Sequence, residues 1–156
     1  MGVVAVLVLA VPIALVVRYA RLTDRAAWPF TVPWDPSWPS LPDVSAAGAL
    51  SVELAQMVYA LVATNEGTLQ HIPCYCGCRS QGHESVHHCH VKRRSADGRV
   101  LEWNDHGRIC PLGADISGDA VFWRQSGTEL AQVRADIERE YSSRGPATLT
   151  PPVPSH

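Results

Sequence analysis

This chain has no excess of positive charge, and it lacks the short motifs that bind nucleotides or haem. Its 156 residues carry 13 Lys and Arg against 15 Asp and Glu, a formal net charge of -2. Nucleic acid is therefore not expected as a partner, because a nucleic-acid-binding face is basic. No glycine-rich phosphate loop of either familiar spacing is present, so nucleotide binding has no support. A C-x-x-C-H motif is also absent, which argues against covalent haem.

Cysteine and histidine are instead concentrated in one short segment. Four of the five cysteines and five of the seven histidines lie between residues 71 and 90. The fifth cysteine, Cys110, follows His106 by a few residues. This density indicates a metal site, a set of disulfides or a redox centre. The odd number of cysteines leaves at least one thiol outside any disulfide.

The N-terminal segment 2–17 has no charged or strongly polar side chain. Sixteen helical residues measure about 24 Å, slightly less than a ~30 Å hydrocarbon core, and the residues that follow can extend the span. No A-x-A-like cleavage site follows, so residues 1–22 are predicted to be an uncleaved transmembrane anchor. Three arginines follow the run and none precedes it, which places the domain in the cytoplasm by charge bias. A cysteine-dense domain favours the outside, and a basic segment missing before the start would remove the conflict.

Proline-rich segments flank the predicted domain. Residues 23–49 contain five prolines and three tryptophans within fifteen residues, and they are predicted to form a semi-rigid linker. The tryptophans are expected at the membrane interface, on a partner or packed on the domain. Residues 145–156 are rich in proline and are predicted to be a disordered tail.

Residues 50–144 are predicted to form one small, mainly α-helical domain. Apolar side chains recur at helical spacing in residues 51–63 and 128–142, and a further helix is predicted over residues 114–125. The last helix is expected to pack against the first through Leu130, Val133, Ile137 and Tyr141.

An irregular loop rich in cysteine and histidine separates the first two of these helices. Its residues 89–103 form either a hairpin that turns at Asp97-Gly98 or a long exposed edge. The predicted fold class is thus mainly α: a single N-terminal transmembrane helix plus a small domain of two to three helices around this loop. So thin a core orders a long loop poorly, and bound metal or cross-links are therefore expected.

The alternating thiols of Cys74, Cys76 and Cys78 can project to one side of an extended chain, and Gly77 allows a sharp turn. Such close C-x-C spacing favours a copper ion, Cu(I), which prefers soft ligands. Zinc is the alternative, through the wider spacing of the outer two cysteines, and an iron–sulfur cluster is less favoured. The predicted metal ligands are Cys74, Cys76, Cys78, His83, Cys89, His106 and Cys110.

Two further expectations concern individual ligands. One of the three histidines that flank Cys89, at positions 87, 88 and 90, is expected to join the site, with the other two solvated. Cys110 is expected just before a helix, where the partial positive charge of the helix start favours a thiolate. Cys110 should therefore share a site with the three alternating thiols.

Disulfides and redox chemistry are the alternatives to metal binding. In an exported protein the cysteines could form two disulfides with one thiol left over. A C-x-C pair could also act as the redox couple of a thiol–disulfide enzyme. Glu102 and Asp105 lie near the loop, but the sequence pairs neither with a nucleophile. A binding role is therefore preferred to an enzymatic one.

The segment of residues 73–78, Pro-Cys-Tyr-Cys-Gly-Cys, resembles the bacterial family named after its PCYCGC motif. The resemblance covers about residues 50–143. It also includes Gly82, His83, Ser85, Cys89, Trp103, His106, Gly107, Cys110, Asp115, Ile116, Ile137 and Tyr141. It implies an exported lipoprotein or membrane-tethered protein, and it supplies no activity. This chain departs from the family pattern because it has no lipobox cysteine, and because Pro-Leu-Gly follows Cys110 where the family has C-x-x-C.

Together these patterns predict a membrane-tethered, extracytoplasmic metal-binding protein of the cell membrane, which captures or transfers copper. Its partners would be the membrane and either a membrane complex or a metal-acceptor protein. An accessory structural subunit of a membrane complex, stapled by disulfides or zinc, is the second hypothesis. A thiol–disulfide redox protein is the third.

Overall fold

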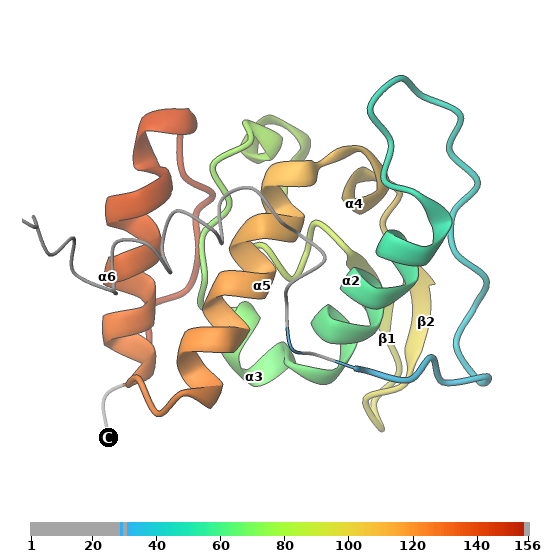
Figure 1. Ribbon diagram of the computed structural model, residues 1–156, viewed down its shortest axis with the longest axis horizontal. Coiled ribbons are helices and arrows are strands. Elements are labelled where there is room, and N and C mark those ends of the chain that lie inside the picture. Colours follow the sequence, from blue (N-terminus) through green and yellow to red (C-terminus); the bar gives the residue numbers. More distant parts are fainter. Residues whose placement is uncertain (1–28, 30, 155–156) are drawn as a thin grey trace, which may run out of the picture.

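The computed structural model describes Pro29 and residues 31–154 (Figure 1). Five α-helices and a two-stranded antiparallel sheet make up most of the regular structure of this part. The elements are α2 (Val52–Thr64), α3 (Glu66–Leu69), the 3-10 helix η2 (Cys78–Gln81), β1 (Val91–Arg94), β2 (Val100–Trp103), α4 (His106–Ile109), α5 (Pro111–Gln125), α6 (Leu130–Tyr141) and the 3-10 helix η3 (Ser142–Arg144).

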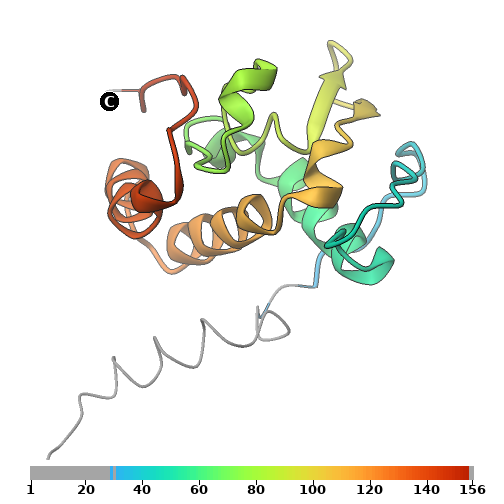
Figure 2. The same ribbon diagram turned by 90° about the horizontal axis from the view of Figure 1, so that it is seen from above.

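The central helix of this arrangement is α5. It packs against α6 on one side and against α2 and α3 on the other. In two perpendicular views α6 lies at one end of the molecule and the β1–β2 hairpin at the other (Figures 1 and 2). Although the sequence led us to expect the last helix on the first, the structure places α5 between them. The expected apolar stripe of α6 is nevertheless buried at Val133, Ile137 and Tyr141.

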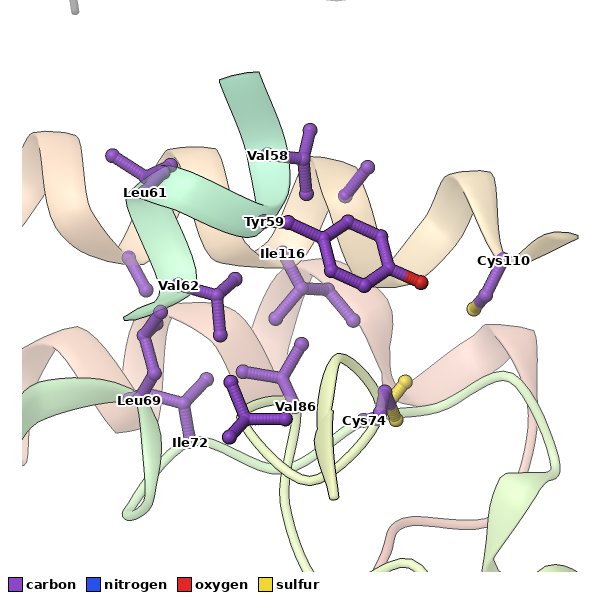
Figure 3. Close-up of a cluster of buried hydrophobic side chains, with 14 of the residues drawn as sticks. Val58, Tyr59, Leu61, Val62, Leu69, Ile72, Cys74, Val86, Cys110 and Ile116 are labelled. Atoms are coloured by element: carbon purple, nitrogen blue, oxygen red, sulfur yellow. The ribbon is translucent and has the colours of Figure 1, made fainter. Parts of the chain in front are cut away.

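Fully buried apolar side chains of α2 and α5 form the core (Figure 3). The helix α2 begins after Ser51, whose Oγ accepts a hydrogen bond from the N–H of Leu54 at 3.2 Å and so satisfies one free donor of the first turn. In its second half α2 is buried on every face, from Val58 to Ala63. The sulfurs of Cys74 and Cys110 lie beside this apolar cluster (Figure 3). The buried cysteines are therefore part of the core.

The fold class predicted from the sequence is wrong in its element count. The described residues contain five helices and a hairpin, and mainly α holds only in part. Two of the helices, α3 and α4, have four residues each, too few to leave a periodic apolar pattern. The strands pair because Gly98, with φ 86°, allows a tight turn beside Asp97.

Within the part of the chain that the structure describes, no helix has both the length and the apolar character needed to cross a membrane. The predicted anchor, residues 1–22, lies outside the described residues. The membrane location and the partners stay predictions from the sequence.

The described part of the predicted linker, Pro29 and residues 31–49, packs on the domain. Trp34 and Trp38 lie against Trp103, with ring centroids 5.6 and 5.7 Å from its ring. Trp103 Nε1–H also donates to the carbonyl of Pro39 at 2.8 Å. Of the expected positions for the tryptophans, the structure shows packing on the domain for these two, because their large apolar rings are removed from water there.

The segment predicted to be a disordered tail also lies against the domain. Thr148 is buried, and two hydrogen bonds join it to the backbone of Cys74. The guanidinium of Arg134 donates to the carbonyls of Thr150 and Pro151. Composition suggested disorder because these residues form no helix or strand, but backbone groups can be satisfied by such contacts as well.

Candidate metal centre

Separate chain segments bring the five cysteines together. Cys74 and Cys76 lie in the loop after α3, Cys78 begins η2, Cys89 lies in the turn before β1, and Cys110 immediately precedes α5. Four of these side chains are buried, and Cys76 is half-buried. The apolar contacts of the core thus hold the thiols next to one another without any covalent link.

Two glycines shape the loop that carries the alternating cysteines. Gly77 and Gly82, on either side of η2, have φ values of 85° and 81°, in the left-handed region that glycine adopts without strain. An added Cβ would meet nothing within 4 Å at either position. The requirement for glycine is therefore conformational. These two residues turn the backbone tightly enough to place the sulfur of Cys78 next to that of Cys89.

The sulfurs lie close to one another without bonding. Cys74 Sγ is 3.3 Å from Cys76 Sγ, and Cys78 Sγ is 3.3 Å from Cys89 Sγ. A disulfide has a sulfur–sulfur distance of about 2.05 Å. All five cysteines belong to the described residues, and none of them forms a disulfide. The predicted disulfide alternative is therefore wrong for this structure, in which apolar packing and not S–S bonds orders the loop.

The seven predicted ligands fall into three overlapping groups whose ligand atoms lie within 4.8 Å of one another. The first group is Cys74, Cys76, Cys78 and Cys89; the second is Cys78, His83, Cys89 and His106; the third is Cys76, His106 and Cys110. These spacings suit a metal ion, because two ligands on opposite sides of one ion are separated by roughly twice a metal–ligand bond of about 2.0–2.3 Å.

Two imidazoles lie beside the thiols and belong to the same ligand groups. His106 begins α4, and its Nε2 is 3.3 Å from Cys76 Sγ. His83 follows η2 with its ring 4.9 Å from the ring of His106, centroid to centroid. The Nδ1 atom of His83 is buried and has no hydrogen-bond partner among the described residues. The protein thus leaves a ring nitrogen free at the place where a metal ion could satisfy it.

Within the cluster, the thiol of Cys76 has a lowered pKa. The thiols of Cys110 and Cys74 lie against Cys76 and hold the pKa of its thiol well below the ordinary value, because they stabilise its thiolate. The same proximity to Cys74 raises the pKa of Cys89, as does burial. The neighbouring thiols of Cys110 and Cys76 raise the pKa of His106 to about 10. The pKa shifts of Cys76 and His106 therefore favour a thiolate–imidazolium pair, next to the thiols of Cys74, Cys89 and Cys110, whose pKa values are raised.

Residues 48–154 match the family described as a protein of unknown function with PCYCGC motif. The chain belongs to this family. No curated protein and no solved structure matches the chain. The motif that names the PCYCGC family supplies three of the five thiols, and its single glycine is Gly77, which has a left-handed backbone conformation.

In this PCYCGC protein Cys110 lies where the sequence predicted, directly before a helix. It caps α5, and its Sγ accepts a hydrogen bond from the N–H of Gly113 at 3.2 Å. An added Cβ at Gly113 would lie 3.2 Å from that sulfur, so a larger residue there would crowd it. The neighbouring thiols of Cys74 and Cys76, and burial, nevertheless raise the pKa of Cys110, opposite to the expected effect of the helix start.

The histidines that flank Cys89 lie in none of the three ligand groups found among the described residues. His90 is fully buried, its Nδ1 is 3.0 Å from the carbonyl of Val86, and burial lowers its pKa to about 4. His87 lies beside Arg94, and burial lowers its pKa to about 3. His88 is half-buried against His83. The sequence had suggested that two of these three histidines are solvated. Instead, His87 and His90 are buried.

Asn104 is a site residue that the sequence reading missed. Its Nδ2 is 3.0 Å from His83 Nε2, and its Oδ1 accepts a hydrogen bond from the N–H of His106 at 3.2 Å. Tyr59 in turn donates its hydroxyl to the carbonyl of Asn104 at 2.6 Å. Asn104 thus contacts the ring of His83 and holds the backbone of His106 from one buried position. Its place two residues before His106 was the one signal of this role in the sequence.

Proposed function

We propose that this PCYCGC-family protein binds copper as a cargo and captures or hands over Cu(I) through its cysteine and histidine centre. One observation carries the proposal. Five free thiols and two imidazoles from separate chain segments form three overlapping groups, and within each group the ligand atoms lie within 4.8 Å of one another. A free buried cysteine packs as a small apolar residue does, so what distinguishes five of them in one place is their reactivity, which includes metal binding.

The number and spacing of the ligands favour copper over zinc. Thiolate sulfurs bind both Cu(I) and zinc, but a structural zinc site takes four ligands in a closed tetrahedron. Seven ligands in three overlapping groups exceed what one zinc ion uses. The short C-x-C spacing from Cys74 to Cys76, with sulfurs 3.3 Å apart, is also tighter than the usual zinc knuckle.

The exposure of the ligands favours capture and release over permanent retention. Cys74, Cys78 and Cys89 are at most 1% exposed, whereas Cys76 and His106 are half-buried. An ion can therefore reach the centre at its outer edge without unfolding of the core. An acceptor's thiol could contact the same edge and remove the ion by ligand exchange.

Metal competition on the full chain, purified without oxygen, tests the proposal. We expect the protein to hold Cu(I) against a coloured Cu(I) chelator and to lose bound Zn²⁺ when Cu(I) is added. A variant with Cys74, Cys76 and Cys78 all changed to serine should lose this retention. His71→Ala serves as the matched control, because that imidazole lies in none of the ligand groups. Zinc that resists displacement by Cu(I), or equal copper retention in the triple variant, would contradict the proposal.

A further inference from the structure

We infer that the centre holds two Cu(I) ions, one deep and one near the surface, with the thiolate of Cys76 as the ligand that bridges them. This inference rests on the proposed function, because it specifies how many ions the same ligands bind. It follows from how the ligands are grouped, how deeply each lies, and which residue the groups share.

A single ion cannot use all seven ligands. At metal–ligand bonds of about 2.3 Å to sulfur and about 2.0 Å to nitrogen, two ligands of one ion lie no more than ~4.6 Å apart. The ligand atoms of the described residues form three groups, each with its atoms within 4.8 Å of one another, which is close to this limit, and none of these groups contains all five thiols. One ion at either end of the cluster would therefore leave ligands at the other end unused.

The first and third groups together account for all five cysteines. The first, which we call the inner group, is Cys74, Cys76, Cys78 and Cys89; the third, which we call the outer group, is Cys76, His106 and Cys110. Cys76 is the residue common to both. A thiolate sulfur has more than one lone pair, so it can bind two ions at once. The geometry therefore places Cys76 where a bridging ligand is needed.

Burial separates the two ions further. The inner group without Cys76 consists of three thiols that are almost completely removed from solvent, and the hydrogen-bond contact of Cys89 with the carbonyl of Ser85 fixes one of them. The outer group contains the two half-buried ligands, Cys76 and His106. The ion in the outer group is therefore the one that exchanges with the surroundings, and the inner ion is retained more tightly.

The second group supplies a connection between these positions. His83 and His106 lie within reach of Cys78 and Cys89, and their rings are 4.9 Å apart. An ion held by the outer group can thus keep His106 as a ligand while it exchanges Cys76 and Cys110 for the buried thiols of Cys78 and Cys89. Filling would proceed from the outer edge inward, and the second ion would then occupy the outer group.

Native mass spectrometry of the full chain counts the ions directly. The protein is loaded without oxygen from a Cu(I)–chelator complex, and we expect a monomer with two copper ions. His106→Ala and Cys110→Ser should each retain one ion, because each removes a ligand of the outer group alone. Cys76→Ser should lose the outer ion and also weaken the inner one. His71→Ala, an imidazole outside all three groups, should keep two.

The possible results separate this inference from the proposed function. A wild-type chain that saturates at one ion overturns the two-ion inference and leaves copper binding intact. Two ions in both His106→Ala and Cys110→Ser, or copper found only in a dimer, also overturns it. A wild-type chain that holds no copper overturns both. The wild-type count does not depend on any variant, so a variant that fails to fold does not prevent the decision.

Discussion

Thr148 is hydrogen-bonded twice to the backbone of Cys74, although the two residues lie far apart in the sequence. The hydroxyl Oγ1 of Thr148 accepts from the N–H of Cys74 at 2.9 Å, and the N–H of Thr148 donates to the carbonyl of Cys74 at 3.0 Å. Both residues are buried. The C-terminal segment therefore fixes the backbone of the first cysteine in the motif.

Replacing Thr148 with alanine should destabilise the metal-free protein by about 1–3 kcal/mol, because the buried N–H of Cys74 loses its acceptor. Copper retention should fall as well, since the loop that carries Cys74 becomes less ordered. Urea unfolding followed by circular dichroism measures the first effect. Leu149→Ala is the control, because Leu149 is 68% exposed. If both variants unfold at the same urea concentration, the role of Thr148 is refuted.

Changing Ile137 to aspartate should cost on the order of 3 kcal/mol, because it buries a carboxylate without a partner. Ile137 is fully buried on α6, which packs against α5, the helix that Cys110 caps. The change should therefore weaken copper retention in addition to stability. Ala131→Asp, at an exposed position of the same helix, should change the free energy of unfolding by less than ~1 kcal/mol. Equal unfolding free energies in the two variants would contradict the buried position of Ile137.

Asn104→Ala should lower the affinity for Cu(I) by roughly 10- to 100-fold while the protein stays folded, as expected for a residue that orients metal ligands. The physical reason is the loss of the contacts from Asn104 to the ring of His83 and to the N–H of His106. Competition with a Cu(I) chelator gives the affinity. Asp105→Ala changes the exposed neighbour and should leave the affinity as it is. An Asn104→Ala protein with the affinity of Asp105→Ala would show that Asn104 does not position the imidazoles.

Two glycine-to-alanine changes should have opposite effects on stability. At Gly107 an added Cβ would lie 2.5 Å from His90 Cδ2 and 2.7 Å from the hydroxyl of Tyr59, so we expect a loss of about 1–3 kcal/mol from overpacking. At Gly67, inside α3, nothing lies within 4 Å, and alanine should stabilise the protein by about 0.4–1 kcal/mol. Thermal unfolding of both variants checks the signs. A Gly107→Ala protein as stable as the wild type would show that Tyr59 and His90 can move apart at little cost.

The sequence was sufficient for the parts of the fold that leave a local pattern. Residues 51–63 and 128–142 show apolar spacing, and the structure has α2 and α6 there within two residues. For the hairpin, Asp97-Gly98 identified the turn but did not decide between two alternatives. The structure brings the seven predicted ligands together, although their role as ligands stays a prediction. Close spacing of thiols was the signal that found them.

Contacts between segments that are distant in the chain could not be predicted from the sequence. Thr148 and Asn104 act through hydrogen bonds to residues that periodicity does not connect with them. The proline-rich segments were predicted to be a linker and a disordered tail, because composition reports the absence of helix and strand and not the presence of packing. Two of the three histidines that flank Cys89 were expected in solvent and one in the site, yet His90 lies in the core beside Tyr59. Polar residues of this kind are placed by the tertiary fold.

X-ray absorption at the copper edge, on the full chain loaded with Cu(I) and freed of excess metal, identifies the atoms that bind the ion. We expect a coordination sphere dominated by sulfur, with a smaller contribution from imidazole nitrogen. Changing His106 to alanine should reduce the nitrogen part and leave the sulfur part. A coordination sphere of oxygen and nitrogen without sulfur would contradict the proposed function, because the ion would then lie outside the cluster formed by the five cysteines.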